Sequence, residues 1–358
     1  MLGSVADRHV ATAPMMRGYV LVRPGMIELR ALPRPRADPD GVVVRVRAAL
    51  TCGTDLKAYL RGHPKIPMPT PFGHEFSGEL AEVGAAVRGL REGDAIMAAP
   101  TAPCGGCYYC RREQENLCPQ VMETMVHGAY AEYLKLPGPV VRTNLFAKPA
   151  RIPFTEAALL EPLACVVHGL SHVRLRPEDT VVLIGAGAIA LLHVLLLRAR
   201  GVERVVVLAR SPGRAAQAQA LPATVLPVGA EEAREPVLEL TQGRGADVVI
   251  ECTGQEHVWE LTPQLARRGG QVVLFGGCPS GTEVRFDTHR LHYDQVSVAS
   301  PFHFTPRDVR VAYELLSSGG FGGRALVAAE YPLEGLGEAL DRQRRGEGAK
   351  FAIVPAAA

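Results

Sequence analysis

The chain has 358 residues, of which 47% are hydrophobic and 21% are charged, and this composition excludes disorder, collagen and coiled coil. The length favours two domains. A formal charge of +2 is too small for a polyanion-binding surface, so nucleic acid is not an expected partner.

The first part of the chain is predicted to be mostly β. Residues 1–16 lack the apolar core of a secretory signal and are expected to form a loose arm. Up to about residue 150, short valine runs alternate with Gly and Pro, which is typical of a small β-barrel or sandwich. In residues 42–48 Val44 and Val46 share one face, and Arg45 and Arg47 share the other. Further strands are predicted near 17–23, 26–30, 73–84, 94–99, 129–136 and 139–142.

From about residue 153 apolar strands alternate with helices. Residues 155–170 form a helical Ala- and Leu-rich run, and strands are predicted at 181–184, 205–208, 248–251 and 272–275. Their spacing leaves room for crossover helices and indicates a parallel, Rossmann-like sheet. Residues 180–197 are interrupted by two glycines and a histidine, so they predict a strand and helix rather than a membrane span.

The end of the chain is predicted to add one helix and one strand. Thr305 is a suitable N-cap and Pro306 a suitable first residue for the helix. The β pattern at 351–354 suggests that the chain returns to the first domain.

The densest motif contains Cys104, Cys107, Cys110 and Cys118. Four thiolates at this spacing suit a tetrahedral Zn²⁺ with no open position, which predicts a structural site. The cysteine spacings of iron–sulfur sites overlap with those of zinc sites, so iron–sulfur ligation is an alternative. A further alternative is that the four cysteines are free or paired in disulfides. Because no secretory signal precedes the motif, metal ligation in a reducing cytoplasm is favoured over disulfides.

A second possible metal site combines Cys52 and His74 with the carboxylates of Glu75 and Glu161. A catalytic zinc takes about three protein ligands of mixed type and keeps one position open for water or substrate. Taken alone these fragments are weak, because a lone cysteine after a valine strand is usually core and a His-Glu pair is usually a satisfied polar pair.

Gly185, Gly187 and Ala190 form a G-x-G-x-x-A turn between a predicted strand and a helix that begins near Ala188 and Ile189. The first glycine permits the tight turn, and the second lets a pyrophosphate approach the helix N-terminus. The turn therefore predicts a dinucleotide site, with a plain strand-to-helix turn as the alternative.

The next predicted strand ends in Ala209, Arg210 and Ser211, and Arg214 follows one helical turn later. An NAD site usually has Asp or Glu at this place to bind the ribose hydroxyls. The missing carboxylate and the two guanidinium groups, expected at one spot, favour the 2′-phosphate of NADP, with NAD as the alternative. A solvated loop with ordinary surface arginines would explain the same residues.

These motifs, with segments 52–55, 73–78, 161–163 and 245–254, resemble the zinc-dependent medium-chain dehydrogenase/reductase superfamily, in its sorbitol and threonine dehydrogenase branch. The resemblance covers about 17–354. It implies an α/β protein with a GroES-like β-barrel catalytic domain (17–160 and 301–358, structural-zinc lobe at 100–120) and a Rossmann cofactor domain (161–300). It also implies two zinc ions per chain, one structural and one catalytic.

The resemblance also implies roles for single residues. Cys52 and His74 would bind the catalytic zinc, and one of Glu75 and Glu161 would join them. Thr54 would hand on the substrate proton.

Three positions depart from the family pattern. Lys57 stands where many members have a histidine of the proton path, and a surface role is its alternative. His303 stands where sorbitol-type members have an arginine, and interface packing is its alternative. Ala209 departs from the NAD-type acidic position and resembles the NADP-type members.

The predicted function is a cytoplasmic, zinc-dependent dehydrogenase that interconverts a secondary alcohol (a polyol, cyclitol or amino alcohol) and its ketone with NAD(P). By resemblance, a homodimer or homotetramer paired near 270–300 is expected. A zinc-free quinone or enone reductase of the same superfamily and a non-catalytic dinucleotide-binding zinc protein are the alternatives.

Overall fold

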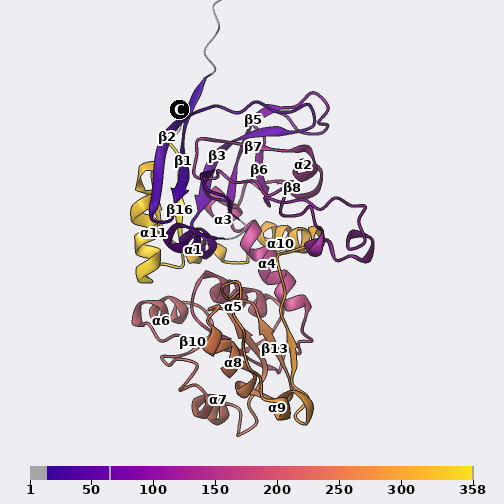
Figure 1. Cartoon of the computed structure of the whole chain (residues 1–358), viewed down its shortest axis with the longest axis vertical. Coiled ribbons are helices and arrows are strands. Elements are labelled where there is room, and N and C mark those ends of the chain that lie inside the picture. Colours follow the sequence, from indigo (N-terminus) through magenta and orange to yellow (C-terminus); the bar gives the residue numbers. More distant parts are fainter. Residues whose placement is uncertain (1–13, 64–65, 357–358) are drawn as a thin grey trace, which may run out of the picture.

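The sheets of the chain lie in two lobes, with helices α4 (Leu160–Ser171) and α10 (Pro306–Ser317) between them (Figure 1). The computed structural model describes residues 14–63 and 66–356. Within these ranges no helix is both long enough and apolar enough to cross a membrane.

The first lobe holds a three-stranded sheet in the order β2-β1-β4 and a seven-stranded sheet in the order β15-β16-β3-β5-β6-β8, with β7 paired to β3. The predicted β domain is therefore confirmed. Its strands are β1 (Met15–Arg23), β2 (Met26–Pro33), β3 (Val42–Leu50), β4 (Thr70–Pro71), β5 (Phe76–Val83), β6 (Ala95–Ala98), β7 (Tyr133–Leu136), β8 (Leu145–Ala147), β15 (Val327–Tyr331) and β16 (Lys350–Ile353).

Two boundary predictions in this lobe are wrong. The strand expected at 139–142 is helix α2 (Gly138–Asn144), because Pro139 lies in the first turn, where a helix needs no backbone N–H donor. Strand β1 already begins at Met15 and pairs there with Pro33, so the arm expected to reach residue 16 ends earlier. The rest of that arm, residues 1–13, lies outside the described residues.

The second lobe is a six-stranded sheet in the order β11-β10-β9-β12-β13-β14, and each pair of neighbours is parallel. This confirms the predicted parallel sheet. Its strands are β9 (Thr180–Ile184), β10 (Arg204–Leu208), β11 (Thr224–Leu226), β12 (Ala246–Glu251), β13 (Ala266–Leu274) and β14 (Ser297–Ala299). Its helices are α5 (Ala188–Ala199), α6 (Pro212–Gln219), α7 (Arg234–Leu240), α8 (Glu256–Leu265) and α9 (Thr288–His292).

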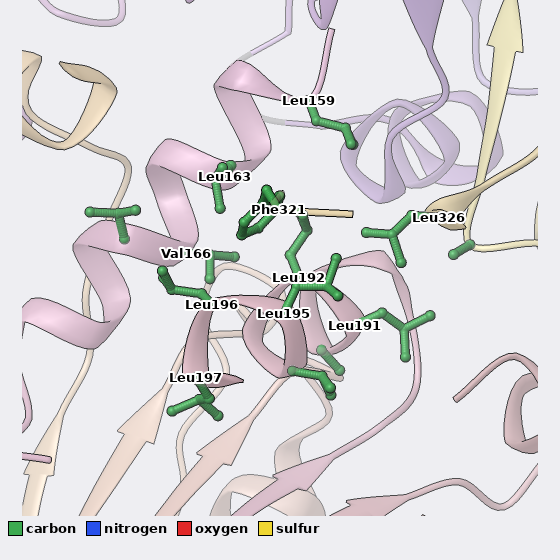
Figure 2. Packing of buried hydrophobic residues seen from close by; sticks show 14 of the residues in the cluster. Leu159, Leu163, Val166, Leu191, Leu192, Leu195, Leu196, Leu197, Phe321 and Leu326 are labelled. Carbon is green, nitrogen blue, oxygen red and sulfur yellow. The ribbon is translucent and has the colours of Figure 1, made fainter. Parts of the chain in front are cut away.

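The sequence predicts one helix over 155–170, but the structure has two, α3 (Phe154–Ala157) and α4. The prediction is therefore wrong at residues 158–159, which separate them. Beyond the break α4 packs on α5, with Leu163 and Val166 facing the leucines of α5 (Figure 2). Helix α10 packs on the same core and begins at the predicted cap, where Thr305 and Asp308 form a capping box. One apolar cluster thus extends across the two lobes, and each lobe also has a cluster of its own.

The chain ends in the first lobe, as expected from its β pattern. Strand β16 pairs antiparallel with β3, where Ala352 lies opposite Leu50. Beyond β3, the N–H of Thr51 donates to the carbonyl of Phe351 (2.9 Å). Helix α11 (Leu336–Arg345) precedes β16, and α1 (Gly53–Arg61) follows β3. This pairing brings Lys350 next to the end of β3, where the cleft between the lobes begins.

Candidate active site

A cleft of about 850 Å³ lies between the lobes, and residues from both line it. The first lobe contributes Cys52, His74 and Glu75, and the turn after β9 contributes Gly185 and Gly187. Its volume is in the range of cofactor and ligand sites, and it includes the carboxyl end of a parallel sheet, where such sheets bind ligands.

The first group of possible metal ligands is Cys52, His74 and Glu75, whose donor atoms all lie within 4.8 Å of one another. Cys52 caps helix α1, and its Sγ accepts from the N–H of Thr54 at 3.4 Å. His74 and Glu75 directly precede β5 and are both buried. A mixed S, N and O donor set with room beside it fits a catalytic zinc.

Asp55 holds the imidazole of His74. Its Oδ1 lies 2.9 Å from His74 Nδ1, and its Oδ2 accepts from the Tyr130 hydroxyl at 2.7 Å. Burial alone would raise the pKa of Asp55, but the nearby His74 and the Tyr130 hydrogen bond keep it below its usual value. A carboxylate on one ring nitrogen leaves Nε2 as the nitrogen for a metal, which is the usual arrangement of metal-binding histidines.

Glu75 has a partner that the sequence did not reveal, the buried Lys350 of β16. Both carboxylate oxygens of Glu75 lie 2.5 Å from Lys350 Nζ. Burial raises the pKa of Glu75 to about 7 although Lys350 opposes the rise. The only sequence signal for this pair was a lysine beside the apolar run at 351–354, which by itself indicates a strand end.

Glu161 belongs to a second group, with Cys165 and His303. The donor atoms of these three residues also lie within 4.8 Å of one another. Cys165 is one turn after Glu161 on α4, a position that no sequence motif indicated. Glu75 is grouped with Cys52 and His74, and Glu161 with Cys165 and His303. The two carboxylates still interact, because the charge of Glu161 contributes to the raised pKa of Glu75.

The three predicted catalytic residues all line the cleft. Thr54 is exposed and Lys57 is half-buried, both on α1. His303 stacks on Phe304 with 3.9 Å between the ring centroids, and its Nε2 lies 2.8 Å from Thr101 Oγ1. Each of these side chains is thus placed beside the space that a substrate would enter.

The four-cysteine lobe gathers its thiols as predicted. The sulfur of Cys110 lies 3.4 Å from that of Cys107 and 3.9 Å from that of Cys104, and all four sulfurs lie within 4.8 Å of one another. A tetrahedron with Zn–S bonds of ~2.3 Å has sulfurs ~3.8 Å apart, so the lobe fits a zinc ion. The N–H groups of Gly106 and Cys107 lower the pKa of Cys104 to about 6, which favours the thiolate.

We expect Cys104→Ser to lower stability without changing turnover. Binding energy at a closed thiolate site is folding energy, and none of the four cysteines is among the residues that line the cleft. The variant should lose one zinc by elemental analysis and melt at a lower temperature, while kcat at a temperature below the transition stays within about twofold. A kcat reduced in proportion to the lost zinc would contradict a structural role.

The glycine turn fits the diphosphate of a dinucleotide. Gly185 has φ +101°, which favours glycine, and a Cβ there would lie 3.0 Å from the Thr253 side chain. Gly187 precedes the first turn of α5, and a Cβ there would lie 3.2 Å from Nη1 of Arg214. Ala188 and Ile189 begin the helix as predicted, and both line the cleft.

At the end of β10 the predicted ribose-binding residues also line the cleft, but the two arginines lie against different glycines. Ala209 is buried, Arg210 is exposed beside Gly229, and Arg214 is half-buried beside Gly187. The sequence predicts both guanidinium groups at one spot. Their placement instead suggests a ribose-side role for Arg210 and a diphosphate-side role for Arg214.

A carboxylate that no sequence motif indicated lies near the same place. Glu231, in the loop after β11, is beside Gly229 and pairs with His257 Nε2 at 2.9 Å. Both residues line the cleft. The negative charge of Glu231 opposes a 2′-phosphate unless Arg210 and His257 offset it.

The motif at 245–254 shapes the turn opposite the glycines. Glu251 Oε1 accepts from the N–H of Gly254 at 2.9 Å, and its Oε2 accepts from Trp259 Nε1 at 3.1 Å. The same indole N–H lies 2.8 Å from the carbonyl of Gly276. The buried carboxylate thus fixes the turn that carries Thr253 against Gly185.

Comparison with known proteins identifies two domain families. The model of the alcohol dehydrogenase GroES-like domain matches residues 38–143, and that of the zinc-binding dehydrogenases matches 188–318. Sorbitol dehydrogenase of Bacillus subtilis (strain 168) is 29% identical over 95% of this chain and 97% of its own. A protein named as D-xylulose reductase A of Aspergillus clavatus is 30% identical over 96% and 98%.

The fold is also that of solved dehydrogenases. A Sinorhizobium meliloti 1021 protein, assigned as a zinc-binding dehydrogenase and crystallised with NADP, superposes with a TM-score of 0.86 at 29% identity. The superposition covers 96% of this chain and all of that one.

Proposed function

Because this chain belongs to the zinc-type medium-chain dehydrogenases, in their polyol and threonine dehydrogenase branch, we propose that it transfers a hydride between a secondary alcohol and NAD(P). The observation that carries the proposal is the position of Cys52, His74 and Glu75 in the same cleft as the Gly185 turn. Cys52, His74 and Glu75 suit a metal that holds the alcohol oxygen, and the Gly185 turn suits the cofactor that takes the hydride.

Different residues of the cleft would bind the metal, orient its ligands and transfer the proton. When bound, zinc polarises the substrate oxygen as a Lewis acid and the nicotinamide exchanges the hydride. Cys52, His74 and Glu75 would hold the metal, and Asp55 keeps the imidazole in its orientation. Thr54, exposed at the start of α1, would pass the alcohol proton towards solvent. The apolar cluster that extends across both lobes packs them together and so helps to orient these groups, which orientation-dependent catalysis requires.

The substrate proposed is a secondary alcohol that carries further hydroxyl or amino groups. Lys57 and His303 supply polar side chains to the cleft, beside apolar contacts such as Leu56 and Phe302. The test is a panel of polyols, cyclitols and amino alcohols, assayed for NADH and NADPH production. Reduction of quinones or enones by a zinc-free sample would favour the zinc-free alternative, and cofactor binding without any turnover would favour the non-catalytic one.

We propose NADP as the preferred cofactor, supported by Ala209 in place of a carboxylate and by the exposed Arg210. Arg210→Ala should lower kcat/KM for NADP about tenfold and leave NAD unchanged, because a charge-assisted hydrogen bond contributes about 1.5–3 kcal/mol before solvent screening reduces it. Arg214→Ala should lower kcat/KM for both cofactors alike, since Arg214 lies beside Gly187.

Steady-state kinetics of both arginine variants with both cofactors test this division. A wild-type preference for NAD would overturn the NADP assignment. The matched variant Glu231→Gln should improve NADP use, because it removes the carboxylate beside Gly229. If Arg214→Ala affected NADP alone, both arginines would serve the 2′-phosphate, as the sequence predicts.

We also propose a homodimer or homotetramer. The supporting feature is β14, the edge strand of the parallel sheet, where Val298 is exposed and Tyr293 lies exposed just before it. An unpaired edge with exposed apolar residues is a place where a second sheet can add. Light scattering that gave a stable monomer at working concentration would contradict this proposal.

We propose a cytoplasmic location, where the environment is reducing. It is supported by the eight cysteines, none of which forms a disulfide bond in the structure.

A further inference from the structure

A pair of histidines lies outside the cleft, at the C-terminal end of helix α4. His168 is in the last turn of the helix and His172 is its C-cap, so the two are four residues apart and lie on one face. His168 is buried and His172 is exposed. Neither is among the residues that line the cleft, and the proposed reaction uses neither.

The two imidazoles are spaced as ligands of one metal ion would be. Nε2 of His168 lies 3.4 Å from Nε2 of His172, and the ring centroids are 4.9 Å apart. A tetrahedral zinc with Zn–N bonds of ~2.0–2.1 Å would place the two nitrogens ~3.4 Å apart and the two centroids ~5.2 Å apart. An ion would therefore join the rings with little movement of either side chain.

Asp308 of α10 orients the buried member of the pair. Its Oδ2 lies 2.9 Å from Nδ1 of His168 and also accepts from the N–H of Thr305 at 2.8 Å. A carboxylate on Nδ1 leaves Nε2 as the nitrogen for a metal, which is the usual arrangement of metal-binding histidines. The contact between Asp55 and His74 in the cleft is of the same kind and has the same length, 2.9 Å.

The surroundings of the pair also favour a cation. The last carbonyl groups of a helix carry partial negative charge, and α4 has 12 residues. Because His172 is exposed, water can occupy the remaining positions around an ion. Imidazole donors suit Zn²⁺ and similar transition metals, whereas Mg²⁺ and Ca²⁺ prefer oxygen donors.

We propose that His168 and His172 form a further metal-ion site, which binds Zn²⁺ after the catalytic and four-cysteine sites are filled. Asp308 belongs to α10, so an ion on His168 strengthens the contact between the two helices that lie between the lobes (Figure 1). An ion that binds only the folded chain stabilises it. The inferred role of this zinc is therefore stabilisation and not catalysis.

The test compares the zinc content of the wild type and His172→Gln after equilibrium dialysis over a series of free Zn²⁺ concentrations. The wild type should bind one zinc more per chain than the variant. Its affinity for that ion should be at least about tenfold higher, because loss of an outer partner alone costs about 10–100-fold at metal sites. His292→Gln is the matched control, since it removes another exposed histidine at the end of a helix, and it should bind as the wild type does.

Thermal unfolding of the same proteins is the second readout. Excess Zn²⁺ should raise the Tm of the wild type and of His292→Gln by a few degrees, and that of His172→Gln by less. Equal zinc content or equal Tm shifts in the wild type and His172→Gln would overturn the proposal, and a hydrogen bond between the two rings would then explain their contact. Neither readout uses an alcohol or a dinucleotide, so the result is independent of the proposed dehydrogenase function.

Discussion

Replacing Cys52 with alanine should lower kcat/KM by about 10³-fold, which corresponds to about 4 kcal/mol of transition-state stabilisation. The variant should hold one zinc per chain where the wild type holds two, because a catalytic site with two remaining protein ligands binds the ion weakly. The fold should persist, since Cys52 is only half-buried and its sulfur makes one weak cap contact with the Thr54 N–H.

Metal analysis, kcat/KM and thermal unfolding of the same preparation test this prediction together. Cys278→Ala is the matched control, because it removes another half-buried thiol and should keep both zinc ions and the activity. Activity above a tenth of the wild type with one zinc lost would show that the Cys52 group is not the catalytic centre. A collapsed thermal transition would assign Cys52 a structural role instead.

The features that could be predicted from the sequence are those carried by neighbouring residues. The parallel sheet, the Gly185 turn and the thiol cluster at 104–118 each depend on a local pattern, and the structure agrees with all three. The strand predicted at 139–142 was wrong because two valines between a proline and an arginine have no period long enough to distinguish a strand from a short helix.

The partners within the site were harder to predict because they are distant in the sequence. Lys350 is 275 residues from Glu75, and His303 is 202 residues from Thr101. The sequence neighbours of Lys350 and His303 do not indicate that either side chain has a buried partner. The contact between Lys350 and Glu75 becomes evident only from the pairing of β16 with β3. Arg210 and Arg214 both line the cleft, but their separation depends on side-chain directions that sequence spacing does not determine.

Lys350→Met should lower the free energy of unfolding by about 3–5 kcal/mol, because it leaves the Glu75 carboxylate buried without its counter-ion. Lys350 is 1% exposed and Glu75 is fully buried, so solvent cannot replace the lost ammonium group. Methionine matches the lysine stem in length and keeps the apolar contacts, which isolates the effect of charge. Denaturant unfolding of the wild type and the variant measures the difference.

The control for this change is Lys135→Met, which makes the same substitution in an exposed pair. Lys135 Nζ lies 2.7 Å from Asp38 Oδ1, but the two side chains are 39% and 51% exposed, so the loss should stay below about 1 kcal/mol. The penalty at Lys350 should also be larger after zinc removal, because a bound zinc offsets part of the Glu75 charge. An equal, small loss in both variants would mean that Glu75 is protonated in the folded protein, and the burial that raises its pKa to about 7 would then dominate over Lys350.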